Sequence, residues 1–145
     1  MNLSTAPIRP RWARIVAGFL IITVLSGAAL LLRSMVKAGT AQVNYTISIL
    51  TLTLAAVVFL TMQCAVVAKP TRDGLYVRNL VRRYYLKWPQ IISVRFSPDR
   101  PWAQLDTSYG EAISVMAIQS ADGAYAEAHA KRLATWVQTG EVEEP

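Results

Sequence analysis

Two long apolar runs dominate the first half of the chain. The first extends from Ile15 to Leu32 and the second from Val43 to Ala68, and neither contains a charged residue. As a helix, the first run is about 27 Å long, close to the roughly 30 Å hydrocarbon core of a bilayer. Two such runs in so short a chain leave too little protein to bury them. The pattern therefore predicts a transmembrane helical hairpin over residues 15–68, with a short loop at 33–42.

The second half of the chain alternates apolar and polar residues over shorter distances. Turn residues such as Thr71–Gly74 separate the stretches. Strand-length stretches lie at 65–68, 75–78, 81–88, 91–97, 102–106 and 112–118. Their length and spacing predict an antiparallel sandwich or partly open barrel. Within the fourth stretch we expect Ile92, Val94 and Phe96 to share one face, because side chains alternate along a strand.

The chain returns to a helical pattern near its C-terminus. The positions that recur at helical spacing are Ala126, His129 or Ala130, Leu133, and Trp136 or Val137. This spacing predicts one amphipathic helix that ends before Gly140. Either Asp122 or Ser120 is expected to be its N-cap, because short polar side chains can accept a hydrogen bond from a free helical amide.

These elements predict an α+β fold, in which two transmembrane helices precede an antiparallel β-barrel or sandwich capped by one C-terminal helix. The expected segments are a basic N-terminus at 1–14, the transmembrane hairpin at 15–68, the β-rich domain at 65–138 and an acidic tail at 139–145. The end of the second apolar run overlaps the domain, since we expect it to leave the membrane as the first strand.

Charge is distributed unevenly along the chain. The net charge is +6, and residues 1–72 hold seven basic residues and no acidic one. By the positive-inside rule, both flanks of the hairpin are expected in the cytoplasm, which predicts a multi-pass inner-membrane protein with a cytoplasmic N-terminus and C-terminal domain. A cleaved signal peptide is the competing interpretation of the first run. It would leave the C-terminal domain on the same side, because the second run would stop translocation.

Few residues of the chain are suited to catalysis or metal binding. The chain has one cysteine, Cys64, and one histidine, His129, so an intrachain disulfide, a cysteine-based zinc site and a histidine cluster are excluded. His129 has no nucleophile or carboxylate at motif spacing, and the chain has no glycine-rich phosphate loop. We therefore expect no enzyme activity, no cofactor and no metal site.

Several short segments carry a family resemblance. GLYVRN at 74–79, VRRYYLKWPQIISVRF at 81–96, the isolated Trp102 and ISVMAIQ at 113–119 resemble the bacterial PH domain of small actinobacterial membrane proteins. These are the proteins grouped with low-molecular-weight protein antigen six, in which two N-terminal transmembrane helices precede one PH-like domain. The resemblance implies a pleckstrin-homology fold over about 65–137, with Trp136 plugging the end of the barrel. Trp88 and Trp102 are expected to be structural as well.

The most basic stretch of the chain begins at the expected membrane exit. The residues that we expect to contact an anionic membrane surface are Lys69, Arg72, Arg78, Arg82, Arg83 and Lys87. Eukaryotic PH domains that bind phosphoinositides carry a basic motif in the loop between their first two strands. Here that loop is Thr71–Gly74, which does not match the motif, so the resemblance does not imply this specificity.

Two functions remain open at this point. The first is a membrane-anchored interaction or scaffold module at the cytoplasmic face, which binds an unidentified protein partner or forms a homo-oligomer. The alternative is a sensor of anionic lipid head groups that uses the basic residues of the sheet. Nucleic-acid binding is not expected, because the chain after residue 100 is acidic, with two basic and seven acidic residues.

Overall fold

The computed structural model describes residues 6–140 of the chain. The described residues form two compact units. One unit is residues 13–64, and the other combines residues 6–12 with residues 65–140. The second unit is called the domain below. It therefore takes in a short segment that precedes the first apolar run, which the sequence pattern did not predict.

The first unit is a pair of helices, α1 (Trp12–Lys37) and α2 (Val43–Cys64), which a turn at 38–42 connects. By length and composition, both helices are long and apolar enough to cross a membrane. Their large apolar side chains are mostly exposed. Polar hydroxyls in α2 bond to the helix itself, since Thr46 Oγ1 donates to the Gln42 carbonyl and Ser48 Oγ to the Asn44 carbonyl. Such bonds satisfy hydroxyl groups where no water is available.

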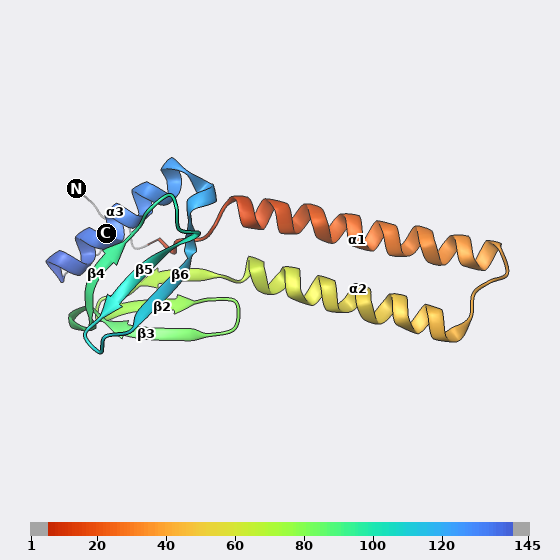
Figure 1. The fold of residues 1–145 in the computed structure, drawn as a ribbon, viewed down its shortest axis with the longest axis horizontal. Coiled ribbons are helices and arrows are strands. Elements are labelled where there is room, and N and C mark those ends of the chain that lie inside the picture. The colour runs from red at the N-terminus through yellow and green to blue at the C-terminus, as the bar shows by residue number, and fades with distance from the viewer. Residues whose placement is uncertain (1–5, 141–145) are drawn as a thin grey trace. The chain divides into compact units, whose positions relative to one another are not determined.

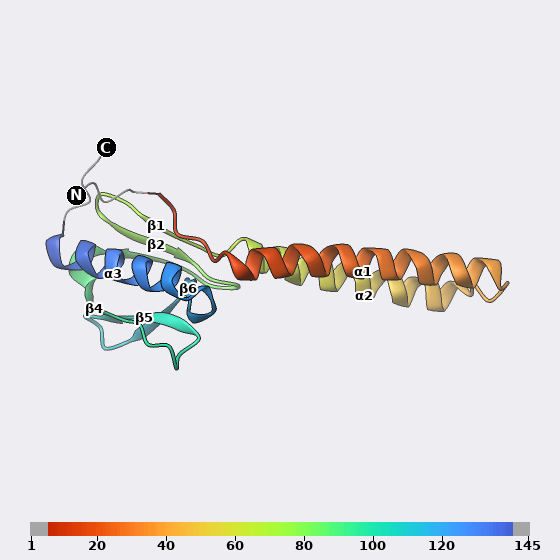
Figure 2. The same ribbon diagram turned by 90° about the horizontal axis from the view of Figure 1, so that it is seen from above.

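The domain consists of two antiparallel sheets and a helix (Figures 1 and 2). The first sheet contains β1 (Val67–Pro70), β2 (Gly74–Arg78) and β3 (Arg83–Lys87) in that order. The second sheet contains β4 (Ile91–Arg95), β5 (Trp102–Thr107) and β6 (Ala112–Gln119) in that order. The 3-10 turn η1 (Trp88–Gln90) joins the sheets, and η2 (Ser120–Asp122) leads into α3 (Ala124–Thr139). This architecture confirms the predicted α+β fold.

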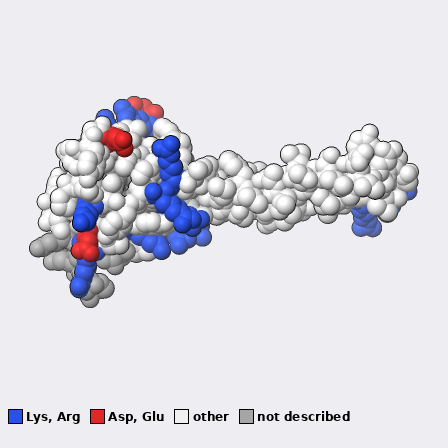
Figure 3. Space-filling model, turned by 90° about the horizontal axis from the view of Figure 1, so that it is seen from below, with Lys and Arg blue, Asp and Glu red and all other residues white. Residues whose placement is uncertain are grey.

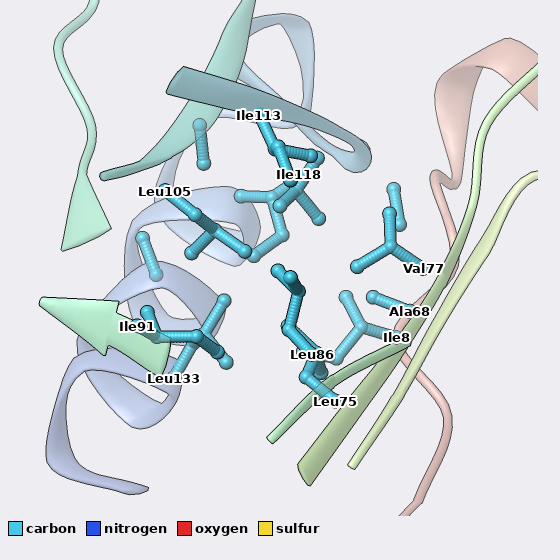
Figure 4. Packing of buried hydrophobic residues seen from close by; sticks show 14 of the residues in the cluster. Ile8, Ala68, Leu75, Val77, Leu86, Ile91, Leu105, Ile113, Ile118 and Leu133 are labelled. Carbon is cyan, nitrogen blue, oxygen red and sulfur yellow. The ribbon is translucent and has the colours of Figure 1, made fainter. Parts of the chain in front are cut away.

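The core of the domain lies between the two sheets and under α3 (Figure 4). Leu75 and Leu86 from the first sheet face Leu105 from the second, and Leu133 and Trp136 from α3 are fully buried against them. Helix α3 packs against β4, β6 and η1. The apolar spacing that predicts the C-terminal helix is thus the spacing that fills one open side of the sandwich.

The second and third strands meet at a close backbone contact. A Cβ atom at Gly74 would lie 2.1 Å from the carbonyl oxygen of Leu86, so only glycine fits at this position. At the other end of the same hairpin, the Asn79 amide donates to the Arg82 carbonyl at 2.9 Å and closes a turn. This turn occupies the first two residues of the predicted strand 81–88, so β3 begins at Arg83.

The prediction for the face of β4 was partly wrong. Val94 and Phe96 pack against the core, but Ile92 is 66% exposed and Ile91 is buried in its place. The reason is an irregular register between β4 and β5, which shifts between Ile91 and Ser93. A shift of this kind breaks the alternation of faces on which the prediction depended.

Residues 6–12 form part of the domain. Ile8 is fully buried and pairs with Ala68, with amide-to-carbonyl distances of 2.8 and 3.0 Å. This short bridge covers the outer edge of β1. Arg132 on α3 donates to the carbonyl of Ala6 at 3.2 Å. The segment expected only as a basic N-terminus is therefore also a structural element.

The predicted N-cap of the C-terminal helix was wrong. Gly123 is the N-cap of α3, and no side chain caps it. Asp122 instead accepts hydrogen bonds from the amides of Arg11 at 3.0 Å and Trp12 at 2.9 Å. Its carboxylate therefore satisfies amides at the start of α1, where no residue of the first turn is acidic. Ser120 lies in η2, which separates it from α3.

Candidate functional site

The outer side of the first sheet gathers most of the predicted membrane-contact residues. Leu75, Val77 and Leu86 point into the core, so the residues between them point outward. We call the outward residues the basic face: Lys69, Tyr76, Arg78, Arg83, Tyr85 and Lys87. It holds four cations, two tyrosines and no carboxylate. Figure 3 shows basic side chains gathered over the β2–β3 side of the domain.

Strand register sets the order within the basic face. Tyr76 lies opposite Lys69 on one side and Tyr85 on the other. Arg78 lies directly opposite Arg83. The two arginines are thus neighbours across the strands, although sequence alone separates them by a turn. Like charges in directly opposed positions repel each other.

The other two predicted cations lie in the turns at the ends of the same sheet. Arg72 is exposed in the turn between β1 and β2, and Arg82 is exposed in the turn between β2 and β3. All six residues predicted to contact the membrane surface therefore belong to one sheet and its turns, four of them on the basic face.

The outer side of the second sheet is electrostatically different. Asp106 accepts a hydrogen bond from Ser93 at 2.6 Å and forms an ion pair with Arg95 at 2.5 Å. The hydrogen bond from the Ser93 hydroxyl has the largest effect on the pKa of the Asp106 carboxyl and lowers it. Burial opposes this with the next largest effect, but the hydrogen bond and charge of Arg95 lower the pKa further, so that it lies below its usual range. Among residues 6–140, the ion pairs are this one and Lys131 with Glu127, and neither lies on the basic face.

The three tryptophans predicted to be structural lie at different depths. Trp136 is fully buried, and its ring centroid lies 6.3 Å from that of the buried Trp88. The indole nitrogen of Trp88 donates to the carbonyls of Thr71 and Arg72 at 3.1 and 3.0 Å. Trp102 is half-buried at the start of β5. Trp88 thus connects the turn between β1 and β2 to the core.

A second surface feature is an apolar groove of about 340 Å³ between β4 and α3. Its lining residues are Val94, Phe96, Pro98, Glu127, Ala130, Lys131 and Ala134. Strand β4 is an edge of the second sheet, since its neighbour in the sheet is β5. The groove combines apolar side chains with a strand edge, which is the arrangement that extended peptide segments use when they add to a sheet. No pattern in the sequence indicated this groove.

The single histidine, His129, is on α3, next to the place where this helix contacts residues 6–12. The His129 ring packs edge-on against Tyr125 with centroids 4.2 Å apart, and the Arg11 guanidinium lies 3.8 Å from the Tyr125 centroid. Burial, and then the charges of Arg132 and Arg11, lower the pKa of His129, against a weaker opposing effect of Asp122. In the described part of the chain, no group of three or more His, Cys, Asp or Glu residues is placed to hold a metal ion.

Comparisons with known proteins agree with this geometry. Residues 64–134 match a family model described as a bacterial PH domain. An uncharacterized protein of Mycobacterium bovis and counterparts from two strains of Mycobacterium tuberculosis are each 43% identical to the chain over 49 residues. The match covers 34% of this chain and 32% of each relative, so it spans about a third of their length. No solved structure matches significantly.

The resemblance inferred from the short motifs is therefore confirmed. Two three-stranded sheets closed by a C-terminal helix, found where the family model matches, give the same assignment from geometry and from sequence. Residues 64–134, which form most of the domain, are therefore similar in sequence and in architecture to the bacterial PH domain family.

Proposed function

We propose that the protein is a membrane-anchored PH module that binds anionic lipid head groups through its basic face. One observation carries the proposal: strand register brings Lys69, Arg78, Arg83 and Lys87 onto one outer surface that has no carboxylate. Each cation near an anionic leaflet contributes about 1 kcal/mol of attraction. The two tyrosines of the face suit a membrane interface, because they combine an apolar ring with a polar hydroxyl.

The sheet pairing of Ile8 with Ala68 supports a hairpin topology for the anchor. These two residues precede α1 and follow α2, and they hydrogen-bond to each other. Both must lie on the same side of any membrane that the helices cross. Cleavage after the first apolar run would remove Ile8 and the buried Pro10 from the domain, which favours an uncleaved first helix. The positive-inside rule assigns the shared side to the cytoplasm.

The topology can be tested by labelling lysines in intact cells. An amine-reactive reagent that cannot cross the membrane should leave Lys69 and Lys87 unmodified until the cells are lysed, because both side chains are exposed on a cytoplasmic domain. Lys37, which ends α1 beside the loop expected outside, serves as the internal positive control. Modification of Lys69 in intact cells would overturn the assignment of side.

Head-group binding can be tested with the full chain in nanodiscs that carry a paramagnetic label on their lipid head groups. Relaxation of the amide signals of β1–β3 should increase when phosphatidylglycerol replaces part of the phosphatidylcholine, and should decrease at high salt. Lys69→Glu combined with Lys87→Glu should abolish the increase. Arg100→Glu combined with Lys131→Glu reverses the same number of exposed charges outside the first sheet and is the matched control. Equal relaxation in neutral and anionic nanodiscs would contradict the proposal.

A second function, protein binding, is favoured by the groove between β4 and α3. We propose that an extended apolar segment of a partner protein occupies it. Ala134→Trp should fill the groove and reduce cross-linking of the partner in native membranes. Ala128→Trp, on an exposed position of the same helix, is the matched control. Unchanged cross-linking by Ala134→Trp would exclude the groove, and links to a second copy of the chain would indicate self-association instead.

A further inference from the structure

The turn between β2 and β3 concentrates three arginines in a small space. Arg78 and Arg83 are direct partners in the strand register, so their Cβ atoms are about 5 Å apart. Arg82 precedes Arg83 and closes the turn through its backbone carbonyl, which accepts from the Asn79 amide. We call these three residues the arginine cluster. Positive charges on such neighbouring residues repel one another, and an anion bound between them would relieve that repulsion.

The chain supplies no such anion among its described residues. The ion pairs of residues 6–140 lie on the second sheet and on α3. The nearest carboxylate along the first sheet is Asp73, in the turn at the opposite end of β2. At strand rise this is roughly 16 Å from Arg78 along the chain. Among residues 6–140, no carboxylate forms an ion pair with the arginine cluster, which leaves the cluster open to an anion from elsewhere.

The arginine cluster is held in place by the second sheet. The side-chain amide of Asn79 donates to the carbonyl of Ser114 at 2.7 Å, and its oxygen accepts from the amide of Met116 at 3.1 Å. One side chain thus ties the turn to two residues of β6. A fixed turn reduces the entropy that must be lost when a ligand binds, so the cluster is suited to a defined site as well as to diffuse attraction.

We infer that the arginine cluster is a binding site for a phosphomonoester group. Guanidinium groups pair bidentately with phosphate oxygens, and a phosphomonoester offers three terminal oxygens and close to two negative charges. A phosphodiester offers two free oxygens and one charge, so the site prefers the monoester. The ligand is either a lipid head group that ends in phosphate or a soluble phosphate. This inference rests on the proposed binding of anionic lipids and narrows it to one site and one head-group chemistry.

The test uses the full chain in phosphatidylcholine nanodiscs, titrated with inorganic phosphate against chloride of equal ionic strength. The amide signals of 79–83 should shift saturably with phosphate and not with chloride. Arg78→Lys combined with Arg83→Lys keeps the charge but loses the planar fork, so phosphate affinity should fall about tenfold. Arg95→Lys combined with Arg100→Lys makes the same change beside the second sheet and is the matched control, which should leave phosphate affinity unchanged. The inference would be overturned if phosphate caused no saturable shifts. It would also be overturned if the Arg78→Lys, Arg83→Lys variant bound phosphate with the affinity of the wild type.

A second arm identifies the source of the phosphate. In nanodiscs that contain phosphatidic acid, a lipid ligand should produce the shifts of 79–83 without added phosphate and should block the titration. In nanodiscs of equal surface charge made with phosphatidylglycerol, the titration should remain. Titration with the same affinity in both would assign the site to soluble phosphate.

The two proposals fail in different ways. If relaxation by head-group labels never depends on lipid charge but phosphate still titrates, the proposed function is wrong and the phosphate site stands. If anionic lipids bind equally well to the wild type and to the Arg78→Lys, Arg83→Lys variant, and phosphate does not titrate, the proposed membrane contact stands and the phosphate site is wrong.

Discussion

The two sheets of the domain both carry arginine on their outer sides, but they use it differently. On the second sheet, Arg95 pairs with Asp106, which Ser93 also contacts. On the first sheet, Arg78 lies opposite another arginine, Arg83, and no carboxylate shares the face. The arginine of the second sheet is satisfied within the fold. Within residues 6–140, Arg78 and Arg83 have no such ion pair, so the two sheets differ in the pairing of their arginines and not only in the number of charges.

The two sheets also differ at their edges, and this second difference gives the largest effect that we expect. Ile8 is buried where it covers β1, and Ile92 is 66% exposed on the edge strand β4. Ile8→Ala should lower the free energy of unfolding by about 2–5 kcal/mol, because it leaves a cavity in the core. Ile92→Ala should change it by less than about 0.5 kcal/mol. Denaturant unfolding of the full chain, followed by tryptophan fluorescence, measures both. If Ile8→Ala lowered the free energy of unfolding as little as Ile92→Ala is expected to, Ile8 would not be part of the folded core.

The link between the sheets gives the next largest effect. Asn79→Ala leaves the Met116 amide and the Ser114 carbonyl without their partner, so unfolding free energy should fall by about 1–3 kcal/mol. The same variant should weaken phosphate binding while leaving every charge in place. Gln104→Ala is the control on the exposed side of the second sheet. A variant that loses stability but binds phosphate normally would show that the arginine cluster needs no fixed turn.

A charge reversal can make the first sheet resemble the second. Arg83→Glu places a carboxylate opposite Arg78, as Asp106 lies beside Arg95. Binding to anionic nanodiscs should fall about tenfold or more, since a cation that contributes about 1 kcal/mol is replaced by an anion. Stability should rise by about 0.2–1 kcal/mol from the new cross-strand pair. Paired head-group relaxation and unfolding measurements check both effects, and a loss of stability would contradict the expected repulsion between the arginines.

The smallest effect expected is the acid sensitivity of the second sheet. The folded-state pKa of Asp106 is lowered by Ser93 and Arg95, so its contribution to stability is present above the ordinary carboxyl pKa. That contribution is lost as the pH falls through the lowered folded-state value. Asp106→Asn should therefore flatten the acid arm of the stability profile slightly and leave anionic lipid binding at neutral pH unchanged. If the free energy of unfolding depended less on acid pH in the wild type than in the Asp106→Asn variant, this prediction would be contradicted.

Much of the fold could be predicted because its signals are local. The two charge-free runs give α1 and α2, and turn residues such as Gly74 and Gly140 mark the ends of strands and helices. The residues that contact each other across β2 and β3 come from a hairpin, so the gathering of the basic residues on one sheet follows from a short stretch of sequence. The site could therefore be predicted as a set of residues, but the sequence did not give their register.

The parts that could not be predicted depend on contacts between distant segments. Ile8 lies in a stretch with two nearby prolines and no periodicity, and its single bridge to Ala68 spans both apolar runs. Asp122 has the sequence context of an N-cap, but a 3-10 turn carries it toward the amides of Arg11 and Trp12. A shift in strand register likewise exposes Ile92. In each case tertiary contacts override a local preference.

The pairing of Ile8 with Ala68 also sets the order of events when the protein is made. Ile8 is synthesised before both apolar helices, and its partner strand after them. At a synthesis rate of about 5–20 residues per second, the first segment must wait several seconds, without a partner, before β1 leaves the ribosome. If the helices insert as they emerge, the domain can close only after the hairpin is in the bilayer. Completion of this sheet is then a late step that depends on successful insertion, and failed insertion leaves the edge of β1 open to proteolysis.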